Sequence, residues 1–385
     1  MPESTLSARL KRIVNPAQAQ NRQQLMLTLA SSLFAIVLAL AVGSLILAIS
    51  GKDWTALFSK MGANLSDRGK LVNTLREATP LMISAVAVAI GFKMNMFNIG
   101  VEGQWLMGAF FGAVVGAQFS LPAPLHIAVI FLVAAAAGAA WASIAGVLKV
   151  SRGVNEVIAT IMLNALVNNV LQFLFDEYFR FTKPGGTLDV KTKPIPSTGW
   201  LPDIGHWIPG IPRGQLSSAF ILALVMVFGY WLLVFKSRFG FRLRASGGNA
   251  TAAATGGINS KKLIIISMAL SGAVAGLVGM DYILAQPSHA WGPSHTTGYG
   301  FDGISVALLG RNNPLGILVS ALLFGFLDTL VGPLQLAKLP SAVIPVIKAV
   351  ILLSVVIVNE VVGVRMAKRT SERAAAELEL AGVAA

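Results

Sequence analysis

Five polar side chains recur at every fourth position of an otherwise apolar segment, residues 154–175. They are Glu156, Thr160, Asn164, Asn168 and Gln172. This spacing places them on one slowly winding side of a helix, over about 24 Å at 1.5 Å per residue. Their chemistry is hydrogen bonding, and two roles fit it. One is to join membrane helices, at about 0.6 kcal/mol per contact. The other, which we favour because five polar residues exceed what packing usually needs, is to line a polar translocation path.

A second polar group interrupts the apolar sequence at residues 95–104. It contains Asn98, Glu102 and Gln104, with Gly100 and Gly103 between them. A helix broken at membrane depth is tolerated where it lines a cavity or is buried in protein, and such breaks often form the substrate sites of transporters. We therefore add these three polar residues to the predicted substrate path. An ordinary cytoplasmic turn is the alternative, and the sequence leaves it open.

A third group, between residues 281 and 302, combines aromatic and polar side chains. Aromatic residues near an outer boundary usually form the interfacial belt, which is the interpretation that we favour. The alternative is a surface that stacks on a planar ligand such as a nucleobase. Asp302 begins a short apolar segment, where a carboxylate suits a helix N-terminus, and it completes the predicted path. The group comprises Asp281, Tyr282, Gln286, His289, Trp291, Tyr299, Phe301 and Asp302.

The sequence lacks the motifs of the common enzyme classes. It contains no G-x-x-x-x-G-K-[ST] phosphate-binding loop, no H-E-x-x-H zinc motif and no G-x-S-x-G nucleophile turn. Gly298 to Gly303 match G-x-G-x-x-G, but this run opens an apolar segment instead of following a strand. The four histidines lack metal-ligand spacing on one helix, and the absence of cysteine excludes thiolate chemistry. We therefore expect no catalytic residue, metal or cofactor in this chain.

The elements that must position these residues are membrane helices. Of the 385 residues, 55% are hydrophobic and 12% are charged, roughly half the charged share of a soluble domain. About 20 apolar residues span a bilayer core, so the sequence predicts an all-α, polytopic membrane protein with about ten transmembrane helices. The predicted segments are 25–49, 77–96, 104–119, 126–148, 154–175, 218–235, 263–284, 314–331 and 341–358, with a shorter one at 301–310.

The basic residues indicate how these segments are oriented. The net charge is +13, but the Lys and Arg residues lie between apolar runs, so membrane orientation explains them better than nucleic-acid binding. With a cytoplasmic N-terminus, 18 of them fall inside and 11 outside, which favours cytoplasmic termini. We expect an N-terminal segment at 1–24, a transmembrane domain at 25–360 whose first helix is a retained anchor, and a C-terminal tail at 361–385. The domain includes an outside loop, 176–217, and a basic inside loop, 236–262.

Small residues recur at helical spacing in several of the predicted helices. Gly108, Gly112 and Gly116 form two overlapping G-x-x-x-G patterns, and Gly272 and Gly276 form a third. Such faces let membrane helices approach closely. We interpret them as packing surfaces.

Four ordered blocks of sequence resemble a known family. They are FNIGVEGQWLMGA (97–109), GVNEVIATIMLN (153–164), RASGGNATAAATGGINSKK (244–262) and GYGFDGISVALLGRNNPLG (298–316). Together they resemble the permease subunits of bacterial ABC importers for nucleosides and simple sugars, in the branch associated with purine nucleosides and basic-lipoprotein receptors. The resemblance covers roughly residues 75–360. It implies the importer-type permease fold in the bacterial cytoplasmic membrane.

The resemblance also implies partners and a mechanism. A substrate-binding lipoprotein would dock outside, a second, paralogous permease would pair with this chain, and ATPase subunits that bind ATP and Mg²⁺ would dock inside. ATP would drive alternating access for a nucleoside, with a simple sugar as the alternative substrate. An ion-coupled secondary transporter is the more distant alternative. The inside loop would carry a coupling helix at about 249–258, with contacts from Asn249, Ala252, Ala253, Gly257 and Ile258.

Overall fold

The computed structural model describes residues 33–181, 190–207, 209–211, 213–294, 298–358 and 361. The predicted N-terminal segment 1–24, the first eight residues of the 25–49 span and almost all of the tail 361–385 lie outside the described residues. The described chain is helical, and its β-structure is limited to two isolated bridges, Phe181 with Lys191 and Asp203 with Ser217. The prediction of an all-α fold is confirmed.

The chain divides into two compact units. One consists of Met1–Leu57 and Ala337–Ala385, and contains the apolar helices Leu33–Ile49 and Val343–Val358. These two helices meet where Gly43 faces the side chains of Val343 and Ile347. The other unit, Phe58–Leu336, contains the remaining helices and all the predicted site residues. The helix α2 (Thr55–Ser66) joins the two along the chain.

Every predicted apolar segment coincides with a helix of the described chain. Among the described residues, six helical stretches are long and apolar enough to cross a membrane: Arg68–Lys93, Ala123–Arg152, Glu156–Phe179, Ala219–Lys236, Ser260–Leu284 and Pro314–Leu336. Their elements are α3 (Arg68–Lys93), α5 (Ala123–Arg152), α6 with η1 (Glu156–Leu174, Phe175–Phe179), α7 with η4 (Ala219–Trp231, Leu232–Lys236), α10 with α11 (Ser260–Gly276, Met280–Leu284), and α13 with α14 (Pro314–Thr329, Val331–Leu336). Shorter helices are α4 (Val101–Gly116) and α12 (Tyr299–Leu309).

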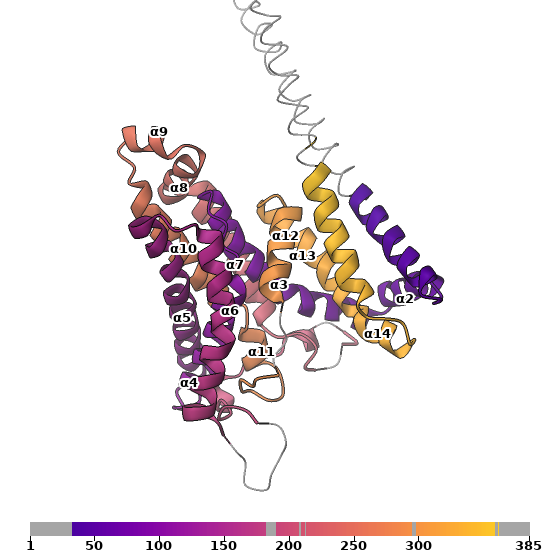
Figure 1. Ribbon diagram of the computed structural model, residues 1–385. Helices are drawn as coiled ribbons and strands as arrows, with labels where there is room; N and C mark the ends of the chain where they lie inside the picture. The colour runs from indigo at the N-terminus through magenta and orange to yellow at the C-terminus, as the bar shows by residue number, and fades with distance from the viewer. Residues whose placement is uncertain are drawn as a thin grey trace, which may run out of the picture. The chain divides into compact units, whose positions relative to one another are not determined.

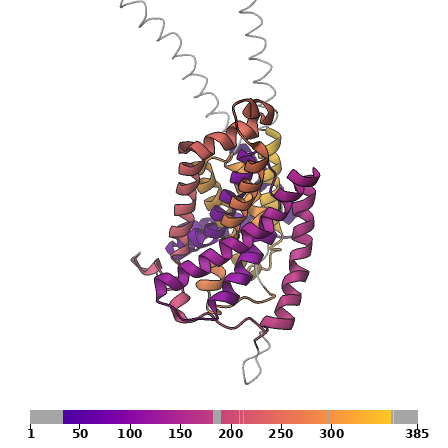
Figure 2. The ribbon, with the colours of Figure 1, turned by 90° about the vertical axis from the view of Figure 1, so that its left-hand side faces the viewer.

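The helix α3 lies at the centre of the larger unit. All its residues from Ala78 to Gly91 are buried, and it contacts α7, α10, α12 and α13. The helices α4 and α5 pack against α10, and α6 packs against α4 and α5 (Figures 1 and 2). A helix that is apolar on all sides is expected in such a central position.

Short polar side chains set the starts of several of these helices. The carboxylate of Asp67 accepts hydrogen bonds from the N–H groups of Gly69 and Lys70 at the start of α3. Asn155 caps α6 in the same way, and Asn313 caps α13 directly before Pro314. A helix start leaves four N–H groups without intrahelical partners, and Asp and Asn are among the side chains that best satisfy them.

Close packing between α4, α5 and α10 depends on glycine. A Cβ on Gly272 would overlap the carbonyl oxygen of Gly138, and a Cβ on Gly276 would overlap that of Ala134. A Cβ on Gly108 would in turn overlap the carbonyl oxygen of Gly276. These backbones touch because no side chain separates them, which supports the interpretation of the small-residue patterns as packing surfaces.

The inside loop differs from expectation in one respect. The sequence predicted one short helix in 236–262, whereas the structure has two, α8 (Arg238–Gly248) and α9 (Ala250–Thr255). The sequence did not predict α8 because it contains glycines at 240, 247 and 248, and glycine is unfavourable in a helix. Gly240 and Gly247 are required by packing, since a Cβ on Gly240 would overlap the carbonyl oxygen of Val234 and one on Gly247 would strike that of Lys93. The helix α8 therefore packs directly on the end of α3.

We expect Gly272→Ala to lower the stability of the folded protein. The added methyl group has no space between α5 and α10, and overpacking of this kind costs about 1–3 kcal/mol. Gly229→Ala is the matched control, since nothing lies within 4 Å of a Cβ at that position of α7. Thermal unfolding in detergent should show a lower midpoint for Gly272→Ala and an unchanged or higher one for Gly229→Ala, because alanine is the better helix former. Equal midpoints would contradict the packing argument.

Candidate functional site

The predicted path residues Asn98 and Gln104 form a reciprocal amide pair. Nδ2 of Asn98 donates to Oε1 of Gln104 at 2.9 Å, and Nε2 of Gln104 donates to Oδ1 of Asn98 at 2.9 Å. Asn98 also donates to the hydroxyl of Ser271 and accepts from the N–H of Gly100. Both amides are fully buried. Every hydrogen-bonding position of Asn98 is therefore occupied within the protein.

This pair joins three helices. Ser271 of α10 receives the bond from Asn98 and donates to the carbonyl oxygen of Ala87 in α3, at 2.6 Å. Gln104 lies in the first turns of α4. A buried polar network in which each member is satisfied fixes one arrangement of its elements. In this state, Asn98 and Gln104 hold α3, α4 and α10 together.

Glu102 binds the start of α12. Its two carboxylate oxygens accept hydrogen bonds from the N–H groups of Gly298 and Gly300, each at 2.7 Å. A Cβ on Gly300 would overlap the backbone nitrogen of Glu102, so the starts of α4 and α12 meet here. A carboxylate is favourable at this position because it satisfies orphan N–H groups and faces the positive end of the helix dipole.

The polar positions of α6 turn from buried to exposed along the helix. Asn164 accepts from the N–H of Gly103 at 2.9 Å and donates to the carbonyl oxygen of Ile99 at 2.8 Å. Thr160 is fully buried. In contrast, Asn168 and Gln172 lie on the exposed side of the helix. Thr160 and Asn164 therefore lie against the turn before α4, whereas Asn168 and Gln172 face away from it.

The remaining predicted path residues occupy two separate places. Glu156 forms an ion pair with Lys149 of α5, with 2.5 Å between Oε2 and Nζ, at the start of α6. Asp302 is partly buried in the first turn of α12. The described structure thus gathers Asn98, Glu102, Gln104 and Asn164 around the start of α4, and a role in substrate passage stays a prediction for all of the path residues.

A polar cavity of about 460 Å³ opens near this junction. Pockets for small ligands commonly enclose roughly 300–1,000 Å³. Its wall comes from the first half of α3, the segment 201–217, α11 with the following residues, and the start of α12. The lining residues are Arg76, Glu77, Pro80, Leu201, Asp203, Gly214, Gln215, Ser217, Asp281, Ala285, Gln286, Pro287 and Tyr299.

Hydrogen-bond acceptors dominate the wall of the cavity. Asp281 accepts a hydrogen bond from the Ser217 hydroxyl, and Glu77 pairs with Arg76 at 2.9 Å. The side-chain oxygen of Gln215 is buried without a hydrogen-bond partner among the described residues. Because proline has no N–H, Pro80 also leaves the carbonyl oxygen of Arg76 without its usual helix bond. A ligand rich in hydroxyl or amino donors would match this wall.

Asp203 is held in its charged form at the edge of the cavity. Burial raises the pKa of this carboxyl, but hydrogen bonds from the N–H of Gly205 and the ring of His206 lower it, and the net pKa lies below its ordinary value. Asp203 is therefore an anion at neutral pH.

Tyr299 connects the cavity to Glu102. Its side chain lines the cavity, while the N–H groups on either side of it, those of Gly298 and Gly300, are bound by Glu102. Its ring also packs edge-on against Trp105, with 5.7 Å between ring centres. The predicted interfacial belt is therefore wrong for Tyr299 and also for Trp291, which is 1% exposed and packs against Phe110 and Phe175.

The other aromatic residues of this group hold the outer loops together. The rings of Trp200 and His289 are stacked, with 3.7 Å between their centres. Burial lowers the pKa of His289 below its ordinary value, so this ring is neutral at pH 7. The N–H of Ile195 donates to the carbonyl oxygen of His289, and that of Thr192 to Trp291. The segments 190–200 and 285–292 are thereby fixed to each other.

The predicted coupling residues lie at the other end of the unit. The side chain of Asn249 caps α9 through the N–H of Ala252, at 2.9 Å. Ala252 is exposed, whereas Ala253 is buried and its carbonyl oxygen accepts from the N–H of Ile258. Gly257 has φ +76°, a value that favours glycine. The helix is limited to Ala250–Thr255, shorter than the expected 249–258.

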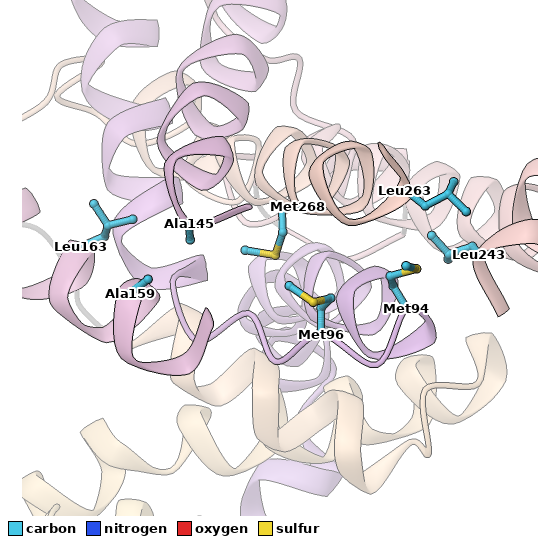
Figure 3. Close-up of a cluster of buried hydrophobic side chains, with 8 residues drawn as sticks. All are labelled: Met94, Met96, Ala145, Ala159, Leu163, Leu243, Leu263 and Met268. Carbon is cyan, nitrogen blue, oxygen red and sulfur yellow. The ribbon is translucent and has the colours of Figure 1, made fainter. Parts of the chain in front are cut away.

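A hydrophobic cluster connects this end to the turn before α4. It contains Leu243 of α8 and Leu263 of α10, with the partly buried Ile258 packed against it. In Figure 3, Met96 and Met268 lie in the middle of the cluster, with Leu243 and Leu263 on one side and Ala159 and Leu163 on the other. Met94 and Met96 precede Asn98 by only a few residues. The base of the α8–α9 loop therefore packs on the segment that carries the amide pair.

Sequence reasoning missed part of the cavity. Asp281, Gln286 and Tyr299 belonged to a recognised group, but Arg76, Glu77 and Ser217 were not selected. Arg76 and Glu77 lie where the predicted apolar segment 77–96 begins, a place where charged residues are common, so only their position in the wall of the cavity reveals them. The sole available signal was Pro80 inside a predicted span.

We expect Glu102→Gln to loosen the start of α12. The amide offers one neutral acceptor and turns a donor toward an N–H group, so about 1–3 kcal/mol of stability should be lost. Thermal unfolding should show a lower midpoint, and hydrogen exchange should show faster exchange at Gly298 and Gly300. The control is Glu177→Gln, at an exposed position of η1. Unchanged exchange in Glu102→Gln would contradict the capping role.

Comparison with known proteins gives the family. Residues 70–359 match the model described as "Branched-chain amino acid transport system / permease component". The guanosine ABC transporter permease NupP of Bacillus subtilis is 36% identical, over 84% of this chain and 91% of that protein. The glucose ABC transporter permease TsgB13 of Haloferax volcanii is 30% identical, over 83% and 84%. A second B. subtilis guanosine permease, NupQ, is 30% identical, over 67% and 80%.

No solved structure matches the chain. The family match covers both the turn before α4 and the start of α12, which together form the polar junction. The chain therefore belongs to the family of membrane permease components of ABC transport systems.

Proposed function

We propose that this permease imports nucleosides, with purine nucleosides as the main substrates. The likeness to NupP over most of both chains carries this proposal. The cavity supports it, since its volume and its carboxylate and amide acceptors suit the hydroxyl groups of a ribose and the amino groups of a base. A simple sugar is the second candidate, because TsgB13 is a glucose permease and the same acceptors would bind its hydroxyl groups.

The substrate would enter at the end that bears the cavity. The cavity includes Arg76 of α3, and α3 meets α8 at Lys93, 17 residues further along. At 1.5 Å per residue, Arg76 and Lys93 are about 25 Å apart along α3. This distance is close to the thickness of a bilayer core. The excess of basic residues around α8 favours a cytoplasmic position for that end and cytoplasmic termini. The cavity would then face the outside of the bacterial cytoplasmic membrane.

The transporter would contain further subunits. The two B. subtilis guanosine permeases that resemble this chain favour pairing with a second, paralogous permease. We propose that ATP and Mg²⁺ bind to separate ATPase subunits docked on the α8–α9 loop, and that an extracytoplasmic binding protein delivers the nucleoside to the cavity. ATP-driven closure of the ATPase would move α9, and the cluster around Met96 would carry this movement to the polar junction.

Reconstitution tests the substrate and the energy source together. Liposomes containing this permease with its candidate partner permease, ATPase and binding protein should take up labelled guanosine and adenosine when ATP is enclosed with the ATPase. Uptake of ribose should be much slower. Faster uptake of ribose than of guanosine would favour the sugar alternative, and uptake by this chain alone under an ion gradient would contradict the ATP-driven mechanism.

A cavity variant extends the same assay. Gln286→Leu removes an exposed hydrogen-bonding side chain from the cavity wall and should raise the guanosine concentration at half-maximal uptake by about tenfold, the loss expected for one hydrogen bond. Gln118→Leu is the control, since Gln118 is an exposed glutamine outside the cavity. Equal values for both variants would remove the cavity from the proposed path.

Ala252→Arg tests the coupling surface. Ala252 is exposed on α9, so the arginine should leave the permease folded while it blocks docking of the ATPase. Ala253 is buried, so an arginine there could also disturb folding, and loss of docking could not be assigned to the surface. We expect loss of ATPase co-purification and of ATP-dependent uptake. Ala123→Arg, at an exposed alanine that begins α5, is the control and should retain the ATPase. Normal ATPase binding by Ala252→Arg would contradict the coupling role.

A further inference from the structure

Basic side chains gather on two aromatic rings where α7 ends. Lys93 and Arg244 both lie over the ring of Phe235, at 5.3 and 5.4 Å from its centre. Lys236 lies over the ring of Trp231, at 5.2 Å. Phe235 lies in the π-helical turn η4 and packs edge-on against Tyr230, with 6.0 Å between ring centres, and Tyr230 directly precedes Trp231. Two cations, from α3 and α8, thus share the ring of Phe235, and a third, from η4, lies over Trp231, four residues earlier in the chain.

These cations lack an anionic partner in the described part of the chain. None of Lys93, Lys236 and Arg244 forms an ion pair with a carboxylate of the described residues. Lys93 is also partly buried. Like charges held close together repel one another, and the repulsion is stronger where water is partly excluded. An external anion at this place would relieve that repulsion.

An apolar groove of about 370 Å³ has Trp231 in its wall. It runs between α7 and the first turns of α13. The lining residues are Leu224, Val227, Phe228, Trp231, Pro314, Leu315 and Leu318. Phe228 and Leu315 are 58% and 74% exposed, so the groove is open at the surface of the described structure. The hydroxyl of Tyr230 donates to the carbonyl oxygen of Asn312 at 2.7 Å and fixes the two walls together.

A groove for a hydrocarbon chain and a cationic site for an anion therefore share one residue, Trp231. This combination has the chemistry of a single amphiphile with an anionic head. Basic pockets between membrane helices on the cytoplasmic side bind anionic lipid head groups, and tryptophan favours the boundary between hydrocarbon and water. A free phosphate ion would leave the groove unused, and an apolar partner helix would leave the cations unused.

We infer that this surface binds one anionic phospholipid, with its phosphate at Lys93, Lys236 and Arg244 and an acyl chain in the groove between α7 and α13. The lipid would join the end of α3 to α7 and α8 at the base of the α8–α9 loop. This inference concerns a different place from the cavity and does not depend on the transported substrate.

The test measures lipid bound to the full-length permease. Delipidated protein in mild detergent is titrated with phosphatidylglycerol, phosphatidylcholine or inorganic phosphate, and native mass spectrometry counts the bound molecules. We expect one phosphatidylglycerol to bind much more tightly than phosphatidylcholine. Each basic residue near an anionic lipid contributes about a fivefold effect, so Lys236→Gln with Arg244→Gln should weaken phosphatidylglycerol binding by roughly 30-fold.

Two further variants separate the contributions of the head group and the acyl chain. Leu315→Trp fills the groove from an exposed position and should weaken phosphatidylglycerol binding while leaving all three cations in place. Arg152→Gln with Lys262→Gln is the matched control: both residues are exposed, on α5 and α10, and outside the groove, so this variant should bind the lipid as the unmodified chain does. Thermal unfolding of each variant confirms that it is folded.

Several outcomes would overturn the inference. Equal affinity for the two lipids, or full binding by the Lys236→Gln/Arg244→Gln variant, would remove the head-group site. Displacement of the lipid by an equal concentration of inorganic phosphate, with no effect of Leu315→Trp, would indicate an ion site without a lipid. Loss of the lipid on assembly with the ATPase or the second permease would assign the surface to that partner.

Discussion

The arrangement of the larger unit depends on how polar backbone groups are satisfied where water is scarce. Two short helices, α4 and α12, start inside the bundle, and each start exposes N–H groups that need acceptors. At the start of α12, the carboxylate of Glu102 accepts from two N–H groups. Near the start of α4, the side chains of Asn98 and Asn164 each accept from one. The broken region at 95–104 is therefore a joint between helices whose polar groups are matched to one another.

This matching changes the meaning of polar residues in a membrane segment. From sequence, an asparagine or a glutamate in an apolar run suggests contact with substrate, because an isolated polar group in hydrocarbon is unfavourable. Here Asn98 has used all its hydrogen-bonding positions on protein groups. Substrate contact at this place would require these bonds to open. Such an exchange is compatible with a transporter, which must adopt at least two arrangements, and the described arrangement is one in which the joint is closed.

The helices could be predicted from sequence because each depends on a local run of apolar residues, and the family resemblance rested on blocks that occur at this joint. Packing surfaces could be predicted where glycines recur at G-x-x-x-G spacing, as at Gly272 and Gly276. The cavity could not be predicted, because Glu77 and Asp281 are distant in sequence and face each other only after α3 and α11 are packed. The burial of Ala253 could not be predicted from the sequence either, because the residues on both sides of it are also alanines and yet are exposed.

The position of Tyr299 has a consequence for energy transfer. Its side chain belongs to the cavity, its ring rests on Trp105, and the peptide groups on either side of it are bound to Glu102. A displacement of α12 therefore alters the cavity wall and the carboxylate bonds at the same time. Thermodynamic linkage requires the relation to be reciprocal: if opening of the joint weakens the hold on a molecule in the cavity by a given factor, occupancy of the cavity opposes opening by the same factor. Through Tyr299, binding of a molecule in the cavity and displacement of the start of α12 would therefore affect each other directly.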